Sequence, residues 1–169
     1  MRPEHLMLPA NRGFIVFTLL LALVLNLFPW GRLLWMPDFV ALVLVFWNVH
    51  EPRKSGIGVG FLLGLLTDVH AGTLFGQHAL AYTVIAYAAT MLHRRLPWFS
   101  LAGQMLQVLP VFLLGQLIIV AVRLASGGTF PGFGLFLQSV ACALLWPLAD
   151  LALRAPQRRP LDPDENRPI

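Results

Sequence analysis

The stretch Gly58–Leu80, GVGFLLGLLTDVHAGTLFGQHAL, decides how the rest of the chain is interpreted. It begins with glycine and apolar residues only, and then Asp68, His70 and His78 follow in quick succession. Three origins are open for these polar residues: a catalytic or metal site, a polar contact for a partner, or the point where the chain leaves a membrane. The choice between them depends on where the apolar segments of the chain begin and end.

Composition places the chain among membrane proteins. Of its 169 residues, 57% are hydrophobic and 12% are charged, with a mean hydropathy of +0.72, whereas about 25% of the residues of a soluble protein are charged. Long apolar runs cover almost the whole length, which predicts an all-α polytopic membrane protein with one transmembrane domain, residues 1–153. The single cysteine, Cys142, lies in an apolar run and is expected to be a buried core residue.

Six apolar segments predict a six-helix transmembrane bundle. They are residues 13–28, 37–49, 55–69, 73–92, 98–125 and 131–153, and the proline-rich residues 154–169 after them predict a disordered cytoplasmic tail. The second and third segments reach only about 20 and 22 Å at 1.5 Å per residue, less than the ~30 Å hydrocarbon core. Shielding by neighbouring helices or a thinned bilayer would accommodate them. The alternative is four or five spans, with this pair forming one hairpin.

The basic residues are distributed unevenly between the two sides of the six-span arrangement. One side has only Arg32 and Arg123. The other side has the remaining ten, namely Arg2, Arg12, Arg53, Lys54, Arg94, Arg95, Arg154, Arg158, Arg159 and Arg167. The positive-inside rule therefore predicts that both termini are cytoplasmic. The same distribution accounts for the high sequence pI of about 10.2, so a nucleic-acid partner is not needed to explain it.

Glycines mark the third segment. Gly56, Gly60 and Gly64 repeat every four residues, which places them on one face of a helix. A helix face without side chains lets another backbone approach closely. We therefore expect this face to make the tightest helix contact in the bundle.

Asp68 falls at the outer end of the third segment, where the helix dipole disfavours a carboxylate. Something should compensate its charge, and the candidates are Arg123, Arg32, His70 and the backbone amides of the loop at Gly72. We expect Asp68 to be a structural and recognition residue that holds residues 69–76 in one shape. The candidate outer-face structural or partner-contact residues are Asp68, Gly72, Gly76 and Asp38, the last of which opens the second helix.

Catalytic and metal sites are poorly supported by the same stretch. Zinc needs at least three ligands, and Asp68, His70 and His78 match no standard ligand spacing. A hydrolase needs a nucleophile next to a base, and only Thr67 and Thr73 lie nearby. We predict no enzyme activity and no cofactor.

Polar residues in the other segments are expected to be structural. Asp150 and Arg154 are four residues apart, as in an ordinary helical ion pair. Gln104, Gln107, Gln116 and Gln138 are expected to form hydrogen bonds between helices.

Four stretches of the chain resemble the MreD family of rod shape-determining proteins. In order, they are MPDFVALVLVFW (36–47), EPRKSGIGVGFLLGLLTDVHAGTLFGQHAL (51–80), IAY (85–87) and LLWPLADL (144–151). The resemblance covers roughly residues 29–153 and is most specific from Pro52 to Leu80.

This resemblance implies an inner-membrane component of the machinery that elongates the wall of rod-shaped bacteria. It implies MreC, a bitopic periplasmic protein, as the foremost partner, with the actin-like MreB, the glycosyltransferase RodA and its transpeptidase in a wider complex. It implies no enzymatic activity. It also implies a fold similar to the six-helix substrate-binding subunits of energy-coupling-factor transporters.

Two functions follow from these observations. The first is a non-catalytic membrane scaffold, which should present an exposed apolar or small-residue helix face. The second is a membrane subunit that binds a small ligand or a lipid-linked precursor, which should present a concave polar pocket at the outer face. The short outer joints and their few charges favour the scaffold.

Overall fold

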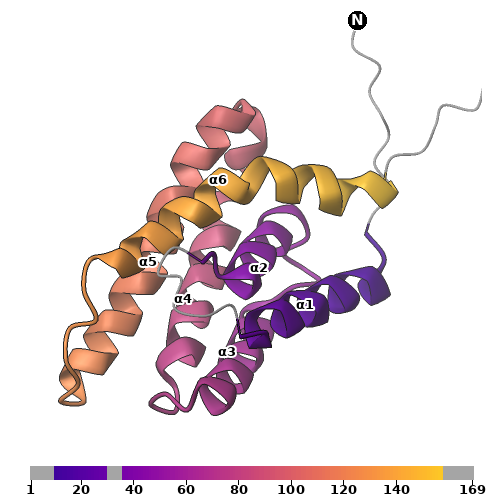
Figure 1. Ribbon diagram of the computed structural model, residues 1–169. Coiled ribbons are helices and arrows are strands. Elements are labelled where there is room, and N and C mark those ends of the chain that lie inside the picture. The colour runs from indigo at the N-terminus through magenta and orange to yellow at the C-terminus, as the bar shows by residue number, and fades with distance from the viewer. Residues whose placement is uncertain (1–9, 30–35, 158–169) are drawn as a thin grey trace, which may run out of the picture.

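The computed structural model describes residues 10–29 and 36–157. In these residues every regular element is helical (Figure 1). The α-helices are α1 (Arg12–Leu27), α2 (Phe39–His50), α3 (Ile57–Ala71), α4 (Gln77–Leu92), α5 (Leu101–Ala125) and α6 (Gly134–Arg154). Short 3-10 helices follow α4 at Leu96–Trp98 and α6 at Ala155–Gln157. Each predicted segment therefore corresponds to one observed helix.

Helix α2 occupies the centre of the bundle. It packs against α1, α4 and α6, and Figure 1 shows α6 crossing over it while α1 and α4 lie on either side. Val40, Leu44, Val45, Phe46 and Trp47 are all completely buried. This short helix is therefore shielded by its neighbours, so its 12 residues do not have to match the thickness of a bilayer.

Helices α5 and α6 have the length and composition of membrane spans. Among the described residues, Leu101–Ala125 and Gly134–Gln157 are each long and apolar enough to cross a membrane alone, whereas α1, α2 and α3 are apolar but shorter. One face of α6 carries a row of exposed apolar side chains at helical spacing, namely Leu137, Val140, Leu144, Leu148 and Leu151. An outward apolar row of this kind suits contact with lipid.

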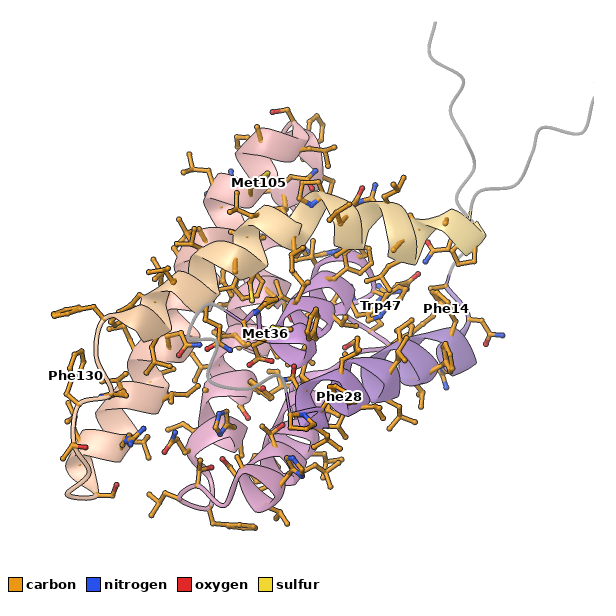
Figure 2. The ribbon with its side chains drawn as sticks, in the orientation of Figure 1. Phe14, Phe28, Met36, Trp47, Met105 and Phe130 are labelled. Carbon is orange, nitrogen blue, oxygen red and sulfur yellow. The ribbon has the colours of Figure 1, made fainter. Side chains whose placement is uncertain are left out.

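Aromatic side chains fill the space between α1, α2 and α6. Trp47 meets Phe14 edge to face at a centroid distance of 5.9 Å, and Figure 2 shows both side chains where α1 and α2 face each other. The indole nitrogen of Trp47 donates to Thr18 Oγ1 at 2.9 Å. Buried Trp146 on α6 donates in the same way to Gln104 on α5. Each large ring thus contributes apolar packing while its polar atom finds a partner on another helix.

The expected polar pairs form, one between two helices and one within α6. Gln116 on α5 donates to Gln138 on α6 at 2.9 Å. Asp150 and Arg154 form the predicted ion pair at 2.9 Å. His50, at the end of α2, contacts the side chains of both of these residues. Sequence spacing could not reveal this third member, since it lies about one hundred positions away.

One end of the bundle brings together the joints with the most basic residues. Lys54 Nζ donates to the Ala10 carbonyl at 2.8 Å, which joins the α2–α3 turn to the residue before α1. His93, just after α4, contacts the carbonyl of Val49 near the end of α2. Because Arg154 meets His50 at this same end, the start of α1 and the ends of α2, α4 and α6 all lie together.

The prediction of a disordered tail from residue 154 is wrong at its beginning. Arg154 is the last residue of α6, and Ala155–Gln157 form a 3-10 helix. The ion pair of Arg154 with Asp150, and a bond from Gln157 Nε2 to the Leu153 carbonyl, extend helical structure past the predicted boundary. Residues 158–169, like Arg2 and Arg32, lie outside the described residues.

Candidate functional site

The carboxylate of Asp68 lies in the last turns of α3 and is only 1% exposed. One oxygen accepts hydrogen bonds from the backbone amides of Gly76 at 2.9 Å and Ala79 at 3.2 Å. The other oxygen accepts from the amide of His78 at 2.8 Å and from Thr73 Oγ1 at 3.1 Å. His78 Nδ1 also lies 2.8 Å from that second oxygen. Five contacts therefore fix this side chain against the following turn and helix.

The turn after α3 explains how a carboxylate is tolerated at the end of a helix. Gly72 ends α3 in the left-handed conformation, with φ of +59°, and Gly76 begins α4 with φ of +101°. Gly76 has no side chain to cap α4, so the free amides of the first turn need another acceptor. Asp68 supplies it from α3. Its charge is unfavourable for its own helix but lies at the positive end of the next one.

The partners of Asp68 differ in part from the predicted candidates. The turn amides were among these candidates, but the amides used belong to Gly76, His78 and Ala79 and lie beyond Gly72. His78 takes the place expected for His70 or Arg123. The sequence separation of ten residues gives no helical signal for this pair, because a reversal of the chain brings the two residues together.

Glycines on α3 let α4 approach its backbone. A Cβ atom on Gly64 would lie 2.3 Å from the Ala79 Cα atom, and one on Gly60 would lie 2.9 Å from the Tyr82 carbonyl oxygen. Gly56 does not share this contact, so its inclusion in the predicted packing face is wrong. It is the N-cap residue of α3, and a Cβ atom there would meet nothing within 4 Å.

Asp38 does more than start α2. Its side chain caps the helix by accepting from the Ala41 amide at 3.0 Å. It also accepts from Asn26 Nδ2 at 2.7 Å and from the Tyr82 hydroxyl at 2.7 Å. Asp38 therefore ties α1, α2 and α4 together at the same end of the bundle as Asp68. The sequence indicated only the cap, because the other two donors come from distant parts of the chain.

An open cavity of about 400 Å³ lies at this end. Figure 2 shows Phe28 and Met36, two of the residues beside it, where the chain passes from α1 to α2. Its lining includes the apolar residues Leu27, Phe28 and Met36 and the polar residues Asn26, Asp38, Thr67, His70, His78 and Gln138. Its size and mixed lining are those of a small-molecule site.

The hydrogen bonds at this end bear on whether its carboxylates could serve a reaction. A carboxylate next to an imidazole resembles the base half of a nucleophilic site, but the nearby Thr67 hydroxyl donates to the Leu63 carbonyl of its own helix. Within residues 10–29 and 36–157, no group of three or more His, Cys, Asp or Glu side chains gathers closely enough to hold a metal ion. The carboxylates of Asp68 and Asp38 instead accept hydrogen bonds from backbone amides and from side chains of neighbouring helices.

Comparison with known proteins connects this architecture to a biological process. The family model described as rod shape-determining protein MreD matches residues 10–155. A protein named rod shape-determining protein MreD from Haemophilus influenzae (strain ATCC 51907 / DSM 11121 / KW20 / Rd) is 35% identical over 145 residues, which cover 82% of this chain and 87% of that protein. No solved structure matches the chain. The chain belongs to the MreD family and is a membrane protein of rod shape determination.

Proposed function

We propose that this chain is a non-catalytic scaffold of the inner membrane that positions proteins of wall elongation. It acts with MreC as its direct partner and with MreB, RodA and the transpeptidase of RodA in a wider complex. Family membership supports the process. The observation that carries the scaffold assignment is the use of Asp68, whose five contacts fix a surface turn instead of serving a reacting group.

The outer turn, residues Val69–Gly76, is the proposed contact surface. Val69, Leu74 and Phe75 on it are 68%, 50% and 70% exposed. Apolar side chains on a fixed turn at the end of a membrane bundle are suited to contact the membrane helix, or the segment next to it, of a bitopic partner. A turn that is already fixed loses little conformational entropy when it binds. The contacts of Asp68 fix the backbone of the turn that carries these side chains.

The orientation of the bundle follows from charge. The ends of α2, α4 and α6 lie together with the joints that carry Arg53, Lys54, Arg94 and Arg95. We assign this end to the cytoplasm by the positive-inside rule. The outer turn then faces the periplasm, on the side where a periplasmic partner such as MreC is available.

Complementation of cells depleted of this protein tests the proposal. The parent chain should restore rods, and Phe75→Ser should leave the cells round even though it accumulates normally, because the variant loses an apolar contact of the outer turn. Phe99→Ser is the matched control, since Phe99 is exposed at the opposite end of the bundle. Rods with Phe75→Ser at parental protein levels would contradict the assignment of the outer turn.

A small-ligand binding subunit is the second candidate, and the open cavity of about 400 Å³ is the observation that favours it. Native mass spectrometry of the purified chain would detect a retained ligand or lipid-linked precursor. Thr67→Trp places a large side chain at the cavity wall and should abolish retention. A bound molecule that is retained by the parent chain and lost in this variant would support the binding function. If the parent chain retains no molecule, only the scaffold function remains. The likeness to energy-coupling-factor subunits stays a prediction.

A further inference from the structure

A second, smaller cavity shares lining residues with the open one, and we call it the inner cavity. Its volume is about 20 Å³, and it lies between α2, α4, α5 and α6. Asp38 and Tyr82 line both cavities. Gln138 lines the outer cavity and Gln116 the inner one, and these two side chains are bonded to each other. Both cavities are therefore lined by the bonded pair of Asp38 and Tyr82, and each is lined by one member of the Gln116–Gln138 pair.

Two polar atoms at the inner cavity have no partner among the described residues. They are Gln116 Oε1 on α5 and Ser139 Oγ on α6. Ser139 is 1% exposed and Gln116 is 7% exposed, and both residues line the cavity. A buried polar atom without a partner is costly. Such atoms are usually satisfied by ordered water when there is room for it.

Asp38 offers a third polar atom to this cavity. A carboxylate has about four lone-pair positions. Three of them accept from Asn26, Ala41 and Tyr82. Oδ1 takes two of these bonds and Oδ2 takes only the one from Tyr82, so Oδ2 keeps a position for one more donor.

We propose that the inner cavity is a binding site for one ordered water molecule. Its volume exceeds the roughly 10–15 Å³ that a water molecule needs. The water donates to Gln116 Oε1 and to the remaining position on Asp38 Oδ2, and it accepts from the Ser139 hydroxyl. Three bonds are the usual number for a buried water. A volume of about 20 Å³ is close to that of one water molecule and far below that of a small-molecule site.

This water links helices α5 and α6 to helices α2 and α4. The hydroxyl of Ser139 and the amide of Gln116 belong to α6 and α5, whereas Asp38 and its partner Tyr82 belong to the α2 and α4 side. Because Asp38 and Tyr82 also line the outer cavity, any partner or ligand that moves them would also disturb the water and, through it, α5 and α6.

Substitution of Ser139 tests the proposal, because a bound water and a dry cavity predict changes of the melting temperature in different directions. If water is bound, Ser139→Ala removes one of its bonds and lowers the melting temperature of the purified full-length chain. If the cavity is dry, the same change removes an unsatisfied hydroxyl and leaves the melting temperature unchanged or higher. Ser126→Ala is the control for the chemical change, because the Ser126 hydroxyl is exposed and donates to the Arg123 carbonyl at the end of α5.

A double-mutant cycle and a density map complete the test. Ser139→Ala and Gln116→Met share no direct hydrogen bond, and their effects on the melting temperature should be non-additive if a bound water couples them. A map that resolves ordered solvent should show a peak within hydrogen-bond distance of Ser139 Oγ and Gln116 Oε1. Additive effects together with no peak at this position would overturn the proposal.

Discussion

Replacement of Gly64 by alanine should destabilise the bundle more than any other single methyl group added to α3. The new Cβ would lie 2.3, 2.5 and 2.6 Å from the Ala79 Cα, Ala79 N and His78 O atoms, whereas ordinary contact begins at 3.4 Å. All three are backbone atoms, so no side chain can rotate away and α4 would have to shift by about 1 Å. Overpacking of this kind costs about 1–3 kcal/mol, and we expect the upper end of this range.

The series of glycines on α3 provides graded controls. Gly60→Ala meets only the Tyr82 carbonyl oxygen below 3.0 Å, at 2.9 Å, and should cost about 1 kcal/mol. Gly58→Ala meets nothing within 4 Å and should be neutral or stabilising by up to ~1 kcal/mol, because alanine is the better helix former. For a chain of this length, each kcal/mol shifts the melting temperature by about 2–4 °C.

The measurement is the thermal unfolding of the three purified full-length variants and the parent in the same detergent. We expect Gly64→Ala to melt about 6–12 °C below the parent, with Gly60→Ala between it and Gly58→Ala. Equal melting temperatures for Gly64→Ala and Gly58→Ala would refute the close approach of α3 and α4.

Three further predictions concern the carboxylates and the topology. Asp68→Leu should lower stability by about 3 kcal/mol or more, because it leaves three backbone amides without their acceptor. Asp68→Asn should cost about 1–2 kcal/mol, because one acceptor oxygen remains. Equal melting temperatures for the two variants would show that these bonds contribute little. Tyr82→Phe should cost about 1.5–3 kcal/mol, since it removes a bond to the buried carboxylate of Asp38, and an unchanged melting curve would contradict that value. Arg53→Cys should react with a membrane-impermeant thiol reagent only after the cells are opened, so labelling in intact cells would reverse the proposed orientation.

The number and order of helices could be predicted from sequence because each depends on a local pattern. Long apolar runs and short polar joints place the elements, and Asp150 with Arg154 could be paired because both lie on one helix. Gly60 and Gly64 could be assigned to a close contact because helix periodicity puts them on one face. Gly56 fits the same period but lies just before the helix starts, and periodicity does not show where a helix begins.

The candidate site could be predicted only in part because its contacts cross between elements. The position of Asp68 indicated that a compensating group was needed, and the turn amides were one of the candidates. The pairing with His78 depends on how sharply Gly72 and Gly76 reverse the chain, and this angle is not encoded by any spacing. The three-helix junction at Asp38 and the inner cavity arise from the packing of helices that are distant in sequence, which no local pattern reports.

Cross-linking in living cells tests the central claim most directly. A photo-reactive amino acid at Phe75, on the outer turn, should form a covalent adduct with MreC. The same group at Trp98, which is 88% exposed at the opposite end of the bundle, serves as the control and should not. An adduct with MreC from position 75 alone is the result we predict. An adduct from position 98 and none from position 75, at equal protein levels, would contradict the account.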